Sequence, residues 1–146
     1  MKDLTTYIKE HLEISNIKEA LEISNIQEAL KINKDSKIRE YNYYPKTNKE
    51  LKRLVNELIE KRGNNADLND INTSNIGDMH SMFYKSDFNG DISKWDVNNV
   101  ENMRCMFSLS KFNKDISNWD IDEYTDIDNI FNGTPLEKNP PKWYKK

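Results

Sequence analysis

Oxygen-bearing side chains alternate along residues 87–93, Asp-Phe-Asn-Gly-Asp-Ile-Ser. Such alternation can wrap a hard cation, and a twelve-residue calcium loop uses it with glycine at its sixth place and a bidentate glutamate at its twelfth. Here Gly90 stands at the fourth place and Asn98 at the twelfth, and Lys111 takes the first ligand place 24 residues later. We therefore expect no calcium site.

Residues suited to nucleophilic or metal chemistry are few. Cys105 is the only cysteine, so no intrachain disulfide can form. His11 and His80 are far apart in the sequence, and no cysteine–histidine cluster has the spacing of a zinc site. Four glycines in the chain do not make a phosphate-binding loop. We therefore expect a protein that is not an enzyme, without cofactor or metal.

A repeat of 24 residues dominates the sequence. Trp95 and Trp119 are 24 residues apart, and residues 88–111 and 112–135 both begin with Phe-Asn-x-Asp-Ile-Ser-x-Trp-Asp. A weaker copy occupies 64–87 in the same register. A fixed period of 20–50 residues is typical of repeat arrays, which bind more often than they catalyse.

Each repeat predicts a strand followed by a helical turn. Residues 92–97 and 116–121 are short and contain residues that favour strands. Apolar residues within 99–107 and 123–131 have helical spacing. The predicted fold is therefore α/β, a short leucine-rich-repeat-like solenoid of three 24-residue repeats over 64–135. The recurring tryptophans and methionines are predicted to be core residues, namely Trp95, Trp119, Met79, Met82, Met103 and Met106.

Polar residues recur at the same period. Asp67, Asp91 and Asp115 form a ladder that we expect to cap turn amides. Stacking of repeats aligns the exposed positions between core residues into one continuous surface. On the strand-bearing face, the predicted partner-binding residues are Asn72, Ser93, Lys94, Asp96, Ser117, Asn118 and Asp120.

The segments on either side of the repeats are predicted to cover the two apolar ends of the array. Within 41–63, Tyr41–Tyr44 suit a short strand, Thr47 and Glu50 form a capping box, and an apolar stripe then runs to Gly63. This helix, over 48–62, is predicted to cover the first repeat. The tail 136–146 holds Trp143 and Tyr144, which either cover the other end or form a basic-aromatic binding tail.

Residues 1–40 are predicted to be a helical leader and linker. Residues 12–20 and 21–29 repeat Leu-Glu-Ile-Ser-Asn-Ile-x-Glu-Ala. A nine-residue repeat places successive apolar stripes on opposite faces of a helix. The duplication is either a slippage in a tolerant leader or a docking helix that self-associates through residues 4–32.

Charge and hydropathy exclude two classes of partner. Residues 64–135 hold 13 acidic and 5 basic residues, or −8, within a chain of net charge −3. An acidic body repels phosphate backbones, so we expect no nucleic-acid binding. No stretch approaches the ~18–20 apolar residues of a membrane span, and no signal peptide or lipid-modified cysteine is evident. The expected location is the cytoplasm, or a particle inside which the protein leaves it.

The repeats resemble a known family. Phe-Asn-x-Asp-Ile-Ser-x-Trp-Asp-Val, followed by Asn-Val-x-Asn-Met-x-x-Met-Phe, is similar to the BspA-type leucine-rich repeat, most clearly over 88–107 and 112–131. The resemblance covers about half the chain. It implies a non-catalytic solenoid, which serves adhesion in bacterial surface proteins and also occurs in short phage-encoded proteins.

The sequence thus leads to three functional hypotheses. The first is a protein–protein interaction module that binds through the strand-bearing face. The second is a phage virion component or injected cargo that docks through residues 1–40. The third is a protein similar to bacterial surface adhesins.

Overall fold

The computed structural model describes residues 40–145, and Tyr41–Lys146 form one compact unit. Over the described residues, the regular helices are the α-helix α3 (Asn48–Arg62) and the 3-10 helix η1 (Pro135–Glu137). The predictions for the leader, including self-association through residues 4–32, fall on residues that lie outside this description.

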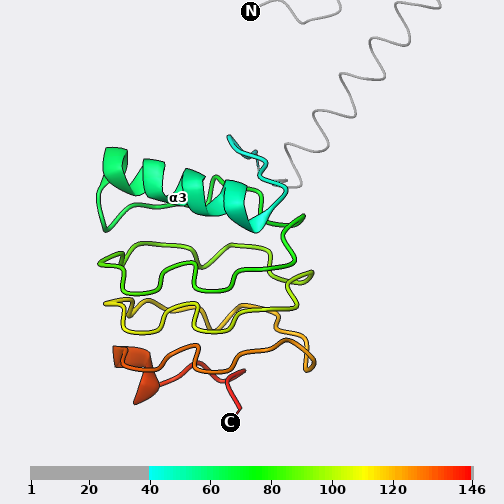
Figure 1. The fold of residues 1–146 in the computed structure, drawn as a ribbon, viewed down its shortest axis with the longest axis vertical. Helices are drawn as coiled ribbons and strands as arrows, with labels where there is room; N and C mark the ends of the chain where they lie inside the picture. Colours follow the sequence, from blue (N-terminus) through cyan, green and yellow to red (C-terminus); the bar gives the residue numbers. More distant parts are fainter. Residues whose placement is uncertain (1–39, 146) are drawn as a thin grey trace, which may run out of the picture. The chain divides into compact units, whose positions relative to one another are not determined.

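Helix α3 confirms the predicted helix and most of its capping. The Thr47 hydroxyl accepts the Glu50 N–H at 3.1 Å, and the Gly63 N–H bonds the Ile59 carbonyl at 2.7 Å. The Glu50 carboxylate accepts the Lys46 N–H at 2.9 Å, whereas a capping box would bond the N–H of Thr47. The helix buries Leu51, Val55 and Leu58 and lies along the first end of the stacked chain (Figure 1).

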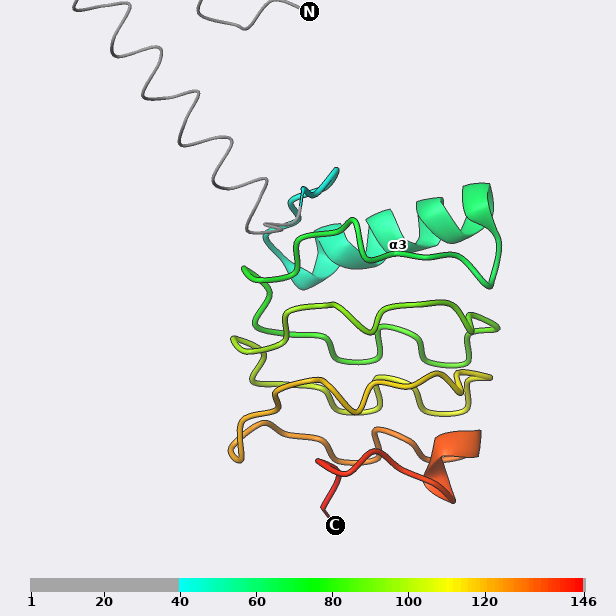
Figure 2. The same cartoon turned by 180° about the vertical axis from the view of Figure 1, so that it is seen from behind.

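From α3 toward the C-terminus, three successive 24-residue segments lie one above another (Figures 1 and 2). We call them coil 1 (64–87), coil 2 (88–111) and coil 3 (112–135). Parallel bridges join residues one period apart: Asp67 to Asp91, Asp78 to Asn102, and Asn102 to Asp126. Backbone hydrogen bonds accompany them, as from the Phe83 N–H to the Met106 carbonyl at 2.8 Å. The sequence period is therefore the period of the stack.

The predicted α/β fold with strands in a leucine-rich-repeat-like solenoid is wrong. Among the described residues, the bridges between the coils are isolated and form no sheet, and the coils contain no α-helix. Residues 92–97 and 116–121, predicted as strands, are instead interrupted by turns. The strand-bearing face on which the binding residues were placed therefore does not exist as a sheet face.

Closely spaced turns explain this difference. The turn that Val100 closes by bonding the Val97 carbonyl is followed by others at Met106, Ser108 and Ser110. Positive φ angles recur one period apart, first at Ser81, Cys105 and Asn129, and again at Lys85, Leu109 and Gly133. A left-handed residue ends a helix and breaks a strand, so apolar spacing alone could not reveal these turns.

Aspartates close many of the turns, as predicted for the ladder. The Oδ1 atoms of Asp67, Asp91 and Asp115 accept the N–H two residues later at 2.8, 2.9 and 2.9 Å. A second ladder, at Asp78, Asn102 and Asp126, makes the same bond at 2.8–3.0 Å. Short polar side chains thus take the place of a sheet in fixing the backbone of each coil.

Aromatic columns fill the interior of the stack. Phe83 and Phe107 lie 5.5 Å apart with an interplanar angle of 2°, and Phe131 continues the column at 5.9 Å. Trp95 and Trp119 are only 3% and 4% exposed, which confirms them as core residues. The four methionines predicted to be core are also buried.

The C-terminal tail prolongs one column. Trp143 stacks on Trp119 at 6.3 Å, and its indole N–H donates to the Ile116 carbonyl at 2.8 Å. Tyr144 packs edge-on against Phe131. These contacts agree with the covering role predicted for the two aromatics. Trp143 also lies 24 residues after Trp119, so the tail keeps the repeat's register beyond residue 135.

Candidate functional site

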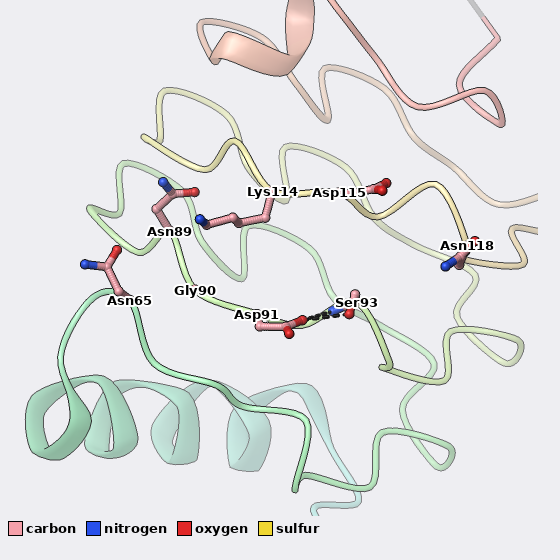
Figure 3. Close-up of a pocket in the computed structure, with 8 residues that line it drawn as sticks. All are labelled: Asn65, Asn89, Gly90, Asp91, Ser93, Lys114, Asp115 and Asn118. Carbon is pink, nitrogen blue, oxygen red and sulfur yellow. Dashed lines mark hydrogen bonds between the residues drawn. The ribbon is translucent and has the colours of Figure 1, made fainter.

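A polar hollow of about 390 Å³ opens where the three coils pass one another (Figure 3). It takes side chains from each coil: Asn65 from coil 1, Asn89 and its neighbours from coil 2, and Lys114 and Asn118 from coil 3. The full lining is Asn65, Asn89, Gly90, Asp91, Ser93, Lys114, Asp115 and Asn118.

Coils 1 and 2 approach closely beside the hollow because residue 90 is glycine. A Cβ on Gly90 would lie 2.0 Å from the Ala66 carbonyl oxygen and 2.6 Å from the Phe88 ring. The close approach lets the Asp91 N–H bond the Ala66 carbonyl at 2.9 Å, and the Leu68 N–H bond the Asp91 carbonyl at 3.0 Å. One glycine thus permits two hydrogen bonds between the coils.

Coils 2 and 3 do not repeat this contact. Lys114 occupies the place of Gly90 one period later, and its Cβ would meet the Gly90 carbonyl at an equally close approach. Among residues 40–145, the Asp115 N–H does not bond Gly90, and the Ile92 N–H does not bond Asp115. The coils are instead joined through a longer link, in which the Asn89 side chain accepts the Asn113 N–H at 2.9 Å. The hollow is the space that remains.

A second substitution adds to the opening. Between coils 1 and 2, the Asn69 side chain accepts the Lys94 N–H at 2.9 Å. One period later the residue is Ser93, whose shorter side chain donates to its own neighbour Asp91 at 2.7 Å. The Asn118 N–H has no equivalent partner among the described residues. The lysine in place of Gly90 and the serine in place of Asn69 therefore both loosen the contact between coils 2 and 3.

The two aspartates in the lining are committed to their turns. Hydrogen bonds from Ser93 and then Asn69 lower the pKa of Asp91, and hydrogen bonds from Ser117 lower the pKa of Asp115. Both groups are therefore carboxylates at neutral pH. Their bonds to Ser93 and Ser117 orient them, so that they serve the hollow as fixed acceptors.

Three other lining residues have uncommitted side chains. Within the described part of the chain, the side chains of Asn65, Lys114 and Asn118 make no hydrogen bond or ion pair, and all three are exposed. Two amides supply both donors and acceptors, and the ammonium group supplies donors and a positive charge. Figure 3 shows Lys114 extended toward Asn89, with Asn65 and Asn118 at opposite ends of the lining.

The structure brings only part of the predicted binding set to the hollow. Ser93 and Asn118 line it. Asn72 and Asp96 instead cap turns, by accepting the N–H groups of Ser74 at 2.9 Å and Asn98 at 3.0 Å.

The remaining predicted residues lie outside the lining. Ser117 donates its hydroxyl to Asp115, and Lys94 and Asp120 are exposed. No observation on these residues tests their proposed binding role, which stays a prediction.

Sequence reasoning missed Asn65, Asn89, Gly90 and Lys114. A signal for them was present, because the aligned repeats read Ala66, Gly90 and Lys114 at one position. Glycine at this position allows the backbones of coils 1 and 2 to touch. Lysine at the same position one period later indicates that coils 2 and 3 lie farther apart there.

Residues with reactive side chains are dispersed. Cys105 is half-buried in a turn at φ 55°, and His80 is exposed, with its ring 3.3 Å from the Ser81 hydroxyl. Over residues 40–145, no group of three or more histidines, cysteines or acidic residues is arranged to hold a metal ion. In the same residues, no helix has both the length and the apolar character needed to cross a membrane.

Comparison with known proteins identifies a family. No curated protein and no solved structure matches the sequence. A family model described as "Mycoplasma protein of unknown function, DUF285" matches residues 49–145, which include all of α3 after its first residue, the three coils and most of the tail. Because the match covers well over half of the chain, the protein belongs to this family.

Proposed function

We propose that the protein is a non-catalytic module that binds a protein partner at the hollow between coils 1, 2 and 3. The observation that carries this proposal is the replacement of Gly90 by Lys114 one period later, which opens a contact that is closed between the preceding coils. The opening leaves the side chains of Asn65, Lys114 and Asn118 without partners among the described residues.

The chemistry of the lining suits a protein surface. Amide, hydroxyl, carboxylate and ammonium groups can pair with main-chain and side-chain groups of a partner. A stable interface covers ~800 Å² on each partner, so the hollow would hold a protruding loop while the surrounding coils supply the rest of the contact.

The resemblance to BspA-type repeats supports a binding role, because it implies a non-catalytic scaffold. The alternatives, a phage virion component docked through residues 1–40 and a surface-adhesin-like protein, rest on the sequence alone and stay predictions. No described residue favours either of them over the first.

Site-specific crosslinking in the producing cells tests the proposal. A photo-crosslinking amino acid placed at Asn118 should capture one discrete protein, and the same residue at Asn65 should capture that protein too. Placement at Glu57, an exposed residue of α3, is the matched control and should not capture it. Equal capture at Glu57, or different products at Asn65 and Asn118, would contradict the proposal.

A further inference from the structure

Tyr124 is the most exposed large hydrophobic residue of those described, at 86%. One and two periods earlier, the corresponding residues Val100 and Ile76 are buried at 2% and 0%. A tyrosine therefore lies on the surface at a position where the other coils place core residues.

A shifted turn places the tyrosine outside. In coils 1 and 2, Ile76 and Val100 close their turns by bonding Thr73 and Val97. In coil 3 the turn closes one residue later, where the Thr125 N–H bonds the Asp122 carbonyl at 3.0 Å. Thr125 is buried and its hydroxyl donates to the Val100 carbonyl at 3.0 Å.

The ring borders a second hollow, of about 380 Å³, that is separate from the one described above. Its lining is Asn98, Asn99, Val100, Glu101, Asp122, Tyr124 and Thr125. Glu101 and Asp122 in this lining are carboxylates, and Glu123 follows Asp122 in the sequence. Among the described residues, none of the three makes an ion pair.

Tyr84, another exposed tyrosine, has a cation over its ring, whereas Tyr124 has none within residues 40–145. The Lys85 ammonium lies 5.2 Å from the centre of the Tyr84 ring, a cation–π contact within the chain. In the described residues, no such cation faces Tyr124. Coils 1 to 3 also carry 13 acidic against 5 basic residues, so the surroundings attract a positive group from outside.

We propose that Tyr124, Asp122 and Glu101 form a docking site for an arginine or lysine side chain of a basic segment in a partner protein. The ring face would receive the cation, and the two carboxylates would pair with its N–H groups. The proposal does not depend on the hollow near Lys114, because the two linings share no residue.

Calorimetric titration of the full chain with a blocked tetra-arginine peptide tests the site. Tyr124→Ala should weaken binding about fivefold, since an exposed cation–π contact is worth roughly that factor. The Asp122 carboxylate accepts the Tyr124 N–H at 2.8 Å through Oδ1, and asparagine keeps an oxygen for this bond. Asp122→Asn and Glu101→Gln should each weaken binding by a similar factor, more strongly at low salt.

Tyr84→Ala and Glu57→Gln are the matched controls, because the Tyr84 ring already faces Lys85 and Glu57 lies on α3. Both should leave binding unchanged. Equal affinity of Tyr124→Ala and the parent chain would overturn the proposal, as would equal losses in the controls. A neutral oligosaccharide that binds only when Tyr124 is present would also overturn it. Failure here leaves the crosslinking at Asn118 unaffected.

Discussion

A Cβ added to Gly90 would lie 2.0 Å from the carbonyl oxygen of Ala66, so coil 2 can approach coil 1 there only because residue 90 is glycine. The consequence for the adjacent coil is that Lys114, at the same place in the repeat, keeps coil 3 from making the same approach. The tight contact and the open hollow thus have a common origin in a single repeat position.

Gly90→Ala should therefore destabilise the protein. The new methyl group would force the backbone of coils 1 and 2 apart, and overpacking of this kind costs about 1–3 kcal/mol. Urea denaturation of the full chain measures the loss. Gly77→Ala is the control, because the nearest atom to its Cβ is the Asn99 carbonyl oxygen at an ordinary 3.7 Å. An equal effect at both positions would show that the Ala66 contact is unimportant.

Acid should weaken the attachment of α3 to coil 1. Arg62 donates to both carboxylate oxygens of Asp70 at 3.0 Å, and this hydrogen bonding lowers the pKa of Asp70 below its ordinary value of 3.8. A carboxyl whose pKa is lowered by folding contributes stability above the unfolded pKa and loses it as the pH falls toward the folded one.

Asp70→Asn should accordingly cost stability at pH 7 and progressively less below about pH 4. The pair is partly exposed, so we expect a cost of about 0.5–1 kcal/mol at pH 7. Denaturation midpoints of both proteins at a series of pH values measure the difference. A difference that stays constant down to pH 2 would contradict the assigned role.

The Trp143 side chain should stabilise the C-terminal end of the stack. Because it is half-buried against Trp119 and Phe131, Trp143→Ala should cost about 2 kcal/mol, less than the loss of a core tryptophan. Trp143→Phe keeps a ring but loses the bond to Ile116, and should cost about 1 kcal/mol. Thermal unfolding measures both, and Lys142→Ala, which should have no effect, is the control.

Amide hydrogen exchange should report the opening between coils 2 and 3. The Asp91 N–H bonds the Ala66 carbonyl, whereas the Asp115 N–H has no such partner among the described residues, so Asp115 should exchange at least about tenfold faster. Lys114→Gly should slow exchange at Asp115, and Lys114→Ala should not, because alanine keeps the Cβ. Comparable protection of Asp91 and Asp115 in the parent chain would contradict the structure of this contact.

Two kinds of feature could be predicted from the sequence: a helix whose ends carry capping residues, and core residues that recur at a fixed period. Helix α3 was evident from Thr47 and Gly63, and the core positions of Trp95 and Trp119 followed from the period. Trp143 follows Trp119 at the same period, but Pro140 and Pro141 lie between them and suggest that the repetition ends before Trp143.

The sheet was predicted wrongly for a physical reason. Ile92 and Val97 favour strands, but each lies within a turn that the preceding aspartate, Asp91 or Asp96, caps, which leaves too few extended residues for a ladder. The candidate site was only partly predictable, because a hollow depends on how closely two coils approach. That distance is set by pairs such as Gly90 and Ala66, which no single-residue preference reveals.

The central claim is that the partner binds where Lys114 holds coil 3 away from coil 2. Its most direct test is the affinity of the crosslinked partner for Lys114→Gly and for Lys114→Ala, compared side by side. Both variants lose the ammonium group, but only glycine permits the coils to close. We predict that Lys114→Gly binds at least about tenfold more weakly than Lys114→Ala, a difference of about 1.4 kcal/mol. Equal affinities of the two variants would contradict the account.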